Sequence, residues 1–411
     1  MTLETKALSS EPTEAQLVTT PAPLPVPSPV ANGTSDKNPE LTPAAGQPPA
    51  QVRLTKPPKG IDTERLIFVP AIRAYAMSIV VVIHVASILA PHFNTIAPYD
   101  WWISNAYHAF SKGGPPLFTL VSGMLLLSVP KEQPIPIFFT KRFIKVLIPF
   151  VGWAAIYLAW RIFYKGEQMD AMGIAQAFFD GPVYYHLWFI QMILGLYLAT
   201  PILRYYVQAA PRSNLGYFLA VWFVGIGLLP FFPRFLGINI KIDLVVMTTY
   251  AGYFVLGYFL KDIVLTPKQS VFCILLVAGF MLLVETFSYL LLINNDGFFD
   301  PFFYNNLGFA MVVIASGLFL FLKSLPYEQI YRTAPPLKWL VVTLAANSLG
   351  VYFVHVLIME LLADGKLGFK LNPFTINTAI GIPLAALVTL ALSVLVTAML
   401  KKIPVVKNIV P

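Results

Sequence analysis

Long apolar stretches separated by short polar ones follow one another from Ile61 to the end of the chain. A helix needs about 20 apolar residues to cross the hydrocarbon core of a membrane, and most of these stretches are that long. They predict about ten spans, at roughly residues 66–90, 105–128, 143–164, 185–203, 215–232, 243–260, 269–293, 304–322, 339–361 and 374–400. We therefore expect an all-α polytopic membrane protein, a bundle of about ten transmembrane helices.

Composition and charge agree with this prediction. Of the 411 residues, 57% are hydrophobic and 12% are charged, whereas a soluble domain has about 25% charged residues. The single cysteine, Cys273, excludes a disulfide within the chain. Under the predicted topology, 14 lysines and arginines lie in the loops and C-terminal tail on one side, and 6 lie on the other. This bias predicts that both termini are cytoplasmic.

Three segments differ in composition. Residues 1–60 are rich in proline and lack aromatic residues, so they cannot bury a core, and we expect a disordered cytoplasmic tail. Residues 61–403 hold all the predicted spans, and residues 404–411 would form a short cytoplasmic tail. The first segment is either a solvated tail or a docking site. The sequence leaves protein partners unknown.

The first span carries two ionisable residues on one face. Arg73 and His84 are eleven residues apart, a spacing that closes to within about 20° of three helical turns and covers about 16 Å. If Arg73 lies at the cytoplasmic rim, His84 lies near the middle of the hydrocarbon core. An ionisable group there costs about 2.5–3.5 kcal/mol and usually marks function. The pair predicts a ligand that enters from one side and reacts in the middle.

The second span is interrupted by Gly113-Gly-Pro-Pro116. Proline cannot continue a helix but suits the first turn of a new one, so we expect a half-helix that starts near Pro115 inside the protein. Just before the break, His108 and Lys112 are four residues apart and share a helical face. They either line a polar cavity, or the break is a simple kink with Lys112 directed outwards.

A basic cluster of Lys141, Arg142 and Lys145 precedes the third span. Such a cluster serves topology and contact with anionic lipids. Alternatively, Arg142 and Lys145 hold the phosphates of a cytosolic cofactor.

Four further residues are candidates for the far side of the same cavity. His186 and Trp188 stand where the fourth span begins, at the outer interface, and His355 lies inside the ninth. Glu285 is the one acid expected deep within a span, and it needs a partner or a proton. Each also has an ordinary structural explanation, as an aromatic anchor or as a polar group that a neighbouring helix satisfies.

Several kinds of site are absent from the sequence. No span has the histidine and carboxylate spacing of a metal site, and no Walker loop, dinucleotide fingerprint or Gly-x-Ser-x-Gly motif occurs. Nothing indicates nucleic-acid binding.

Taken together, these residues resemble the membrane acyltransferase-3 family of bacterial integral-membrane O-acyltransferases. The resemblance runs from about Leu66 to Ile403, and the motifs are most similar to those of the branch that acetylates surface polysaccharides and lipid-linked glycans. The landmarks, in order, are Arg73 with His84, Pro116-Leu-Phe-Thr-Leu-Val-Ser-Gly123, the basic cluster, His186-Leu-Trp188, and Ser348-Leu-Gly-Val-Tyr-Phe-Val-His355. Ser122 belongs to the second of these.

The resemblance implies a bundle of about ten helices in the bacterial inner (plasma) membrane. It implies acetyl-CoA, or succinyl-CoA, as the co-substrate, no tightly bound cofactor, and a sugar hydroxyl as the acceptor. It marks Arg73 and His84 as catalytic and the basic pair as donor-binding. The family often has Arg-x-x-Arg where this chain has Arg142-Phe-Ile-Lys145. Lysine lacks the bidentate fork of arginine, so the pair is a weaker match.

The expected mechanism places the CoA phosphates on Arg73, Arg142 and Lys145, with the thioester near His84. His84 then either accepts the proton of the acceptor hydroxyl or carries the acyl group itself. The start of the half-helix at Pro115 would stabilise the oxyanion. The alternative is a proton-coupled transporter or exporter, which a broken span and a buried Arg–His pair also suit.

Overall fold

The computed structural model describes residues 66–129, 134–179, 181–239 and 249–410, which belong to one compact unit. No strand occurs in these residues, which confirms the all-α prediction. The expected tail at residues 1–60 lies outside them. The α-helices are α1 (Phe68–Ser87), α2 (Pro98–Ser111), α3 (Gly114–Leu127), α4 (Ile135–Ala159), α5 (Ala171–Phe179), α6 (Trp188–Ala209), α7 (Arg212–Phe223), α8 (Ala251–Leu260), α9 (Pro267–Ile293), α10 (Phe309–Ser324), α11 (Tyr327–Thr333), α12 (Pro335–Ala363) and α13 (Thr378–Leu400). Short turns follow some of them: 3₁₀ turns at Ala90–His92, Phe302–Tyr304 (η7) and Val406–Ile409 (η8), and π-helical turns at Trp160–Tyr164 (η3), Val224–Leu228 and Phe232–Leu236.

Within the described residues, eight helical segments are long and apolar enough to cross a membrane. They are α1, α6, α9, α12 and α13, together with Ile135–Tyr164, Arg212–Leu236 and Phe302–Ser324. The other two predicted spans correspond to the broken pair α2 and α3 and to the shorter helix α8. The protein is therefore a polytopic membrane protein, as the hydropathy pattern predicts.

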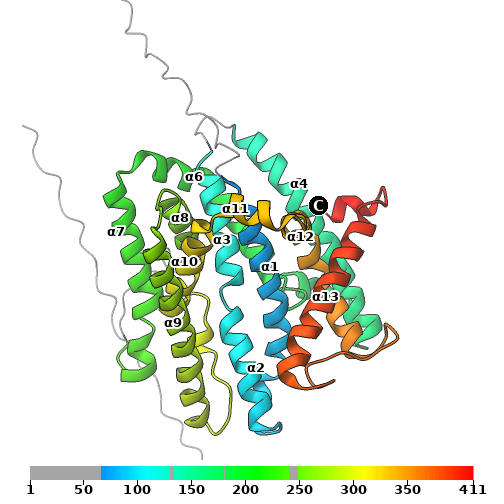
Figure 1. Cartoon of the computed structure of the whole chain (residues 1–411). Helices are drawn as coiled ribbons and strands as arrows, with labels where there is room; N and C mark the ends of the chain where they lie inside the picture. The colour runs from blue at the N-terminus through cyan, green and yellow to red at the C-terminus, as the bar shows by residue number, and fades with distance from the viewer. Residues whose placement is uncertain (1–65, 130–133, 180, 240–248, 411) are drawn as a thin grey trace, which may run out of the picture. The chain divides into compact units, whose positions relative to one another are not determined.

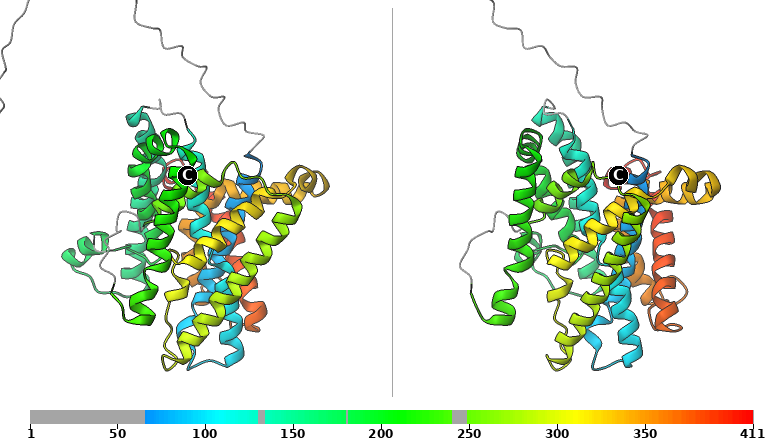
Figure 2. Two further views of the ribbon diagram at one scale, coloured as in Figure 1. Left: turned by 90° about the vertical axis from the view of Figure 1, so that its left-hand side faces the viewer. Right: turned by 60° about the vertical axis from the view of Figure 1, so that its left-hand side comes forward.

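Helix α1 lies inside the bundle, with α3 and α12 beside it (Figures 1 and 2). It also packs against α2, α10 and α13. Its composition explains this position, because it is apolar on almost every face and carries small residues such as Ala74 and Ala76, both buried, where neighbours approach. A residue on α1 can therefore contact several helices at once.

Two glycines set the distance between α3 and α8. A Cβ atom on Gly123 would lie 2.0 Å from the carbonyl oxygen of Phe254, and one on Gly257 would lie 2.0 Å from that of Leu120. Both distances are far inside contact range, so each helix accepts the backbone of the other only where a side chain is missing. This reciprocal contact fixes the position of α3.

The second span breaks where the prolines predict. Helix α2 ends at Ser111, and α3 starts at Gly114 with Pro115 and Pro116 in its first turn. The hydroxyl of Ser104 donates to the carbonyl of Ala86 at 2.7 Å, which ties α2 to the end of α1.

The C-terminal residues pack against α4. The indole of Trp153 donates to the carbonyl of Ile409 at 2.9 Å, and Val410 is 1% exposed. The segment expected to form a tail is thus held on the bundle as far as residue 410.

Gly257→Ala should destabilise the protein by about 3 kcal/mol or more, because the new methyl group meets backbone that cannot rotate away. Gly279→Ala in α9 is the matched control, since nothing lies within 4 Å of its added Cβ. It should be neutral or slightly stabilising. Thermal unfolding in detergent measures both; equal melting temperatures would contradict the close contact.

Candidate active site

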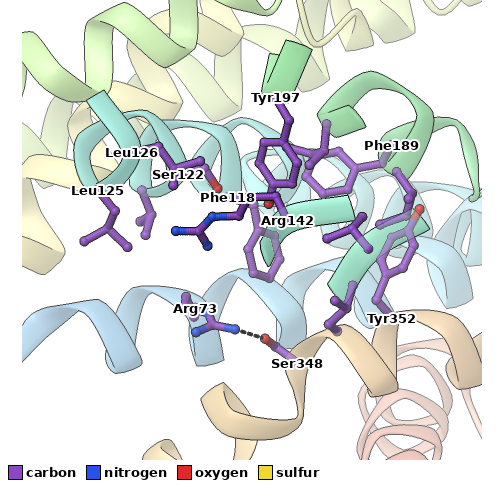
Figure 3. Close-up of a pocket in the computed structure, with 15 residues that line it drawn as sticks. Arg73, Phe118, Ser122, Leu125, Leu126, Arg142, Phe189, Tyr197, Ser348 and Tyr352 are labelled. Atoms are coloured by element: carbon purple, nitrogen blue, oxygen red, sulfur yellow. Dashed lines mark hydrogen bonds between the residues drawn. The ribbon is translucent and has the colours of Figure 1, made fainter. Parts of the chain in front are cut away.

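A cavity of about 270 Å³ opens among α1, α3, α4, α6 and α12 (Figure 3). The guanidinium groups of Arg73 and Arg142 face the same space, and Tyr352 and Phe189 lie at the other end. Its lining consists of Arg73, Phe118, Val121, Ser122, Leu125, Leu126, Arg142, Val146, Phe189, Ile190, Ile193, Tyr197, Ser348, Leu349 and Tyr352. Three of the residues predicted for the site, Arg73, Arg142 and Ser122, therefore meet here.

The charge of this cavity is unbalanced. Arg73 donates from Nη2 to the hydroxyl of Ser348 at 2.9 Å, a neutral partner. Arg142 has no hydrogen bond or ion pair in the part of the chain that the structure describes. The lining contains no Asp or Glu. Two guanidinium groups without a counter-ion in a partly apolar cavity make an anion-binding site.

Arg142 reaches the cavity from a helix, not from the end of a loop. The predicted third span begins at about residue 143, but α4 begins at Ile135, so the basic cluster lies inside the helix. Lys145 is exposed and does not line the cavity. Residues three apart on a helix differ by about 60° in direction, which separates Arg142 from Lys145 here. Of the predicted donor-binding pair, Arg142 therefore lines the cavity and Lys145 does not, and the donor-binding role of Lys145 stays a prediction.

A third arginine, Arg204, was expected in a cytoplasmic loop but is 3% exposed within α6. Its Nε and Nη2 donate to the carbonyl of Leu126 at 3.1 and 2.9 Å. Gln208 donates to the carbonyls of Leu127 and Val129. These contacts satisfy the free carbonyls at the C-terminus of α3 and place a positive charge at the negative end of its dipole.

An aromatic wall closes the inner end of the cavity. The rings of Tyr352 and Phe189 lie 5.8 Å apart, and the hydroxyl of Tyr352 donates to the backbone carbonyl of His186. His84 does not line the cavity. The expectation that Arg73 and His84 border one open tunnel is therefore not met in this conformation, because Tyr352 stands between the two levels.

Behind this wall three histidines meet. The ring centre of His84 lies 5.2 Å from that of His355 and 6.4 Å from that of His186, and the latter two are 5.4 Å apart. They come from α1, from α12 and from the residue two before α6. Their gathering supports the prediction that polar groups of distant spans share one site.

The ring nitrogens of this cluster are poorly satisfied. His355 Nδ1 lies 2.7 Å from the carbonyl of Tyr352, which fixes Nδ1 as the protonated nitrogen and leaves Nε2 with a free lone pair. Neither ring nitrogen of His186 has a partner. Buried polar atoms without partners are rare in folded proteins and indicate a ligand or water. No group of three or more histidines, cysteines and acids suited to a metal ion occurs in the described residues.

His84 is reached from the side opposite to Arg73. The His84 side chain is half-buried, and its ring centre lies 5.3 Å from that of Tyr185, which is 48% exposed. His186 was predicted at the outer interface, but it is 1% exposed and faces the cluster. Trp188 packs against Phe189 and Tyr250, away from the histidines.

Three further ionisable residues do not line the cavity. Lys112 and His108 approach the cluster from the α2–α3 break, within electrostatic range of His84. Glu285 lies on α9 within electrostatic range of Tyr304 and forms no ion pair in the described chain. The reading of Lys112 as a lysine directed out of the bundle is wrong.

Glu360 was missed. It lies in the last turn of α12, and its side chain is 16% exposed. Its carboxylate accepts from the indole of Trp160 at 2.8 Å and from the hydroxyl of Tyr184, and it pairs with Lys165 at 2.9 Å. Burial, and then the bond to Glu360, raise the pKa of Tyr184, so its phenol stays protonated and donates.

This carboxylate anchors the segment that carries two rings of the cluster. Tyr184 stacks on Tyr157 at 4.7 Å, and Tyr185 and His186 follow it directly in the chain. The segment is therefore held by Glu360 through Tyr184 and by Tyr352 through the carbonyl of His186.

The fold and the site together define a polytopic α-helical membrane protein with a cationic cavity and a buried histidine cluster. A family model described as an acyltransferase domain, that of the acyltransferase-3 family, matches residues 66–398. The chain belongs to this family and is a membrane acyltransferase. Neither the curated proteins nor the solved structures gave a match.

Glu360→Ala should lower stability by about 2–4 kcal/mol, since it leaves Trp160, Tyr184 and Lys165 without their acceptor. Glu360→Gln keeps one acceptor oxygen and should lose less. Glu167→Ala is the control. Glu167 pairs with Arg161, but its side chain is 41% exposed, and such a surface ion pair contributes under about 1 kcal/mol to stability. Melting temperatures in detergent rank the three, and a Glu360→Ala variant as stable as Glu167→Ala would refute the anchoring role.

Proposed function

We propose that this acyltransferase moves an acyl group, most simply acetyl, from cytosolic acyl-CoA to a sugar hydroxyl of a surface or lipid-linked glycan. The observation that carries the proposal is the pair of unneutralised guanidinium groups, Arg73 and Arg142, in a cavity one level away from His84. Phosphates are the anions that arginine pairs hold best. Family membership favours acyl transfer over the alternative of proton-coupled transport.

The cavity is cationic at one end and apolar along its walls, which matches the two parts of an acyl-CoA donor. Its arginine end would take the phosphates of CoA, and its apolar walls, Phe118 and Phe189 among them, would take the flexible arm that carries the thioester. For the thioester to reach His84, the ring of Tyr352 has to move. That side chain is held by one hydrogen bond, to the carbonyl of His186, so rotation about its χ angles breaks a single polar contact.

His84 would act on the thioester from behind this wall. In direct transfer, His84 takes the proton of the acceptor hydroxyl, the oxygen forms a bond to the acyl carbon, the carbon–sulfur bond breaks, and the thiolate receives the proton. If His84 carries the acyl group, its ring nitrogen bonds to the acyl carbon, the carbon–sulfur bond breaks and the CoA thiolate leaves. The acceptor oxygen then bonds to the acyl carbon, the carbon–nitrogen bond breaks, and the hydroxyl proton passes to the freed ring nitrogen and from it to the thiolate. Tyr185, exposed beside His84, marks the side from which the acceptor would arrive.

His84→Ala should abolish acyl transfer while the protein remains folded in the membrane. His92→Ala is the matched control, because His92 is exposed just beyond α1. The assay offers purified protein radiolabelled acetyl-CoA together with envelope glycans from cells that lack the gene. Labelled glycan formed by His84→Ala at the wild-type rate would end the proposal. Uptake of label into vesicles without covalent transfer would favour the transporter.

Arg73→Ala and Arg142→Ala should each raise the KM for acetyl-CoA at least about tenfold, the loss expected for one charge-assisted hydrogen bond to a phosphate. Lys145→Ala should leave it nearly unchanged, because Lys145 is exposed outside the cavity. Raising the ionic strength should increase the wild-type KM more than that of either variant. Equal effects of Arg142→Ala and Lys145→Ala would contradict this placement of the donor.

A further inference from the structure

The ammonium group of Lys112 has no counter-ion among the residues that the structure describes. It forms a cation–π contact with the ring of Tyr304, whose centre lies 5.4 Å from Nζ, and no side-chain hydrogen bond within the described residues. No carboxylate there lies within ion-pair distance. A lysine that belongs only to the fold would be paired, or would reach the membrane surface, because an uncompensated charge in the bundle is destabilising.

The break between α2 and α3 directs this group towards His84. A Cβ atom on Gly114 would lie 2.6 Å from Val80, so the start of α3 packs on α1 one turn from His84. Further down, Ser104 bonds the carbonyl of Ala86. His84 therefore lies between the levels of Ser104 and Gly114. Side chains on a helix lean towards its N-terminus, so Lys112 reaches back to the level of His84.

Unsatisfied polar atoms surround the same place. His108, one turn before Lys112, is 6% exposed and its Nδ1 has no partner. Its ring stacks on Tyr304 at 4.3 Å. Tyr304 donates its hydroxyl to Oδ1 of Asn105, which leaves Nδ2 of that amide, itself 3% exposed, without an acceptor. An ammonium group and an amide N–H₂ are donors, so what is missing is an acceptor, and beside a positive charge a negative oxygen fits best.

We propose that Lys112, Asn105 and His108 form a binding site for a negatively charged oxygen on the α2–α3 side of His84. This inference rests on the proposed function, which brings an acyl group to His84. Two oxygens have the required chemistry. One is the carbonyl oxygen of the acyl group, which becomes an oxyanion as the tetrahedral intermediate forms. The other is a free carboxylate on the acyl group, as in succinyl-CoA.

The experiment compares acetyl-CoA and succinyl-CoA as donors for wild type, Lys112→Met and Lys112→Arg, with the envelope-glycan acceptor. Lys112→Met keeps the unbranched side chain and removes the charge. Lys338→Met, at an exposed lysine of α12, is the control. If Lys112 stabilises the oxyanion, Lys112→Met lowers kcat about 100-fold for both donors with little change in KM, and Lys112→Arg restores part of it. If Lys112 holds a carboxylate, only the KM for succinyl-CoA rises.

Stability separates a binding role from a structural one. Removing an unpaired charge should leave the melting temperature of Lys112→Met unchanged or raise it. A large fall in melting temperature together with lost activity would overturn the inference, because it would make Lys112 a structural residue. Wild-type rates with both donors in Lys112→Met would overturn it as well. A wild-type protein inactive with both donors would instead refute the proposed function, and the inference would fall with it.

Discussion

The structure depends on where it places three positively charged side chains, Arg73, Arg142 and Lys112, that form no ion pair within the described residues. Among the described residues, no acid lines the cavity that Arg73 and Arg142 face, and Lys112, beyond the next layer of side chains, forms no ion pair. Elsewhere in the described bundle, the buried Arg204 donates to the carbonyl of Leu126, and Lys165 pairs with Glu360. Some cations therefore stabilise the fold, whereas others remain free to bind a ligand. The second group lies on or near α1.

The site is arranged in levels along that helix. Arg73 and Ser348 stand at the first level, Tyr352 with Phe189 forms the second, and the three histidines form the third. Glu360 and Tyr184 close the far end. Helix α12 supplies a residue to every level: Ser348, Tyr352 and His355 recur at helical spacing on one side of the helix, and Glu360 follows further along it on another side. Two adjacent helices thus set both the depth of each group and the order in which a substrate would meet them.

Local spacing was enough to predict part of this arrangement. The eleven residues from Arg73 to His84 predicted one helical face at two depths, and Gly-Gly-Pro-Pro predicted the break before α3; both follow from geometry within a single helix. The role of Glu360 could not be predicted from the sequence, because its partners Trp160, Tyr184 and Lys165 lie 176 to 200 residues away from it. Lys145 is a different case: its position in the sequence resembles that of a site residue, but its direction on α4 leaves it outside the cavity that Arg142 lines. The aromatic wall at Tyr352 needed the packing of α6 against α12, which no pattern within one span encodes.

The backbone contact between α3 and α8 has a consequence for how this site tolerates change. Ser122 lines the cavity, and the next residue, Gly123, touches the main chain of Phe254. The position of the α3 wall is thus set by main-chain atoms, whose size does not change with sequence. The walls formed by α6 and α12 consist of side chains, which substitutions can change. Divergence in the lipid-facing residues of α8 would leave the width of the cavity at Ser122 constant, and selectivity for different acyl donors would have to evolve on the α6 and α12 faces.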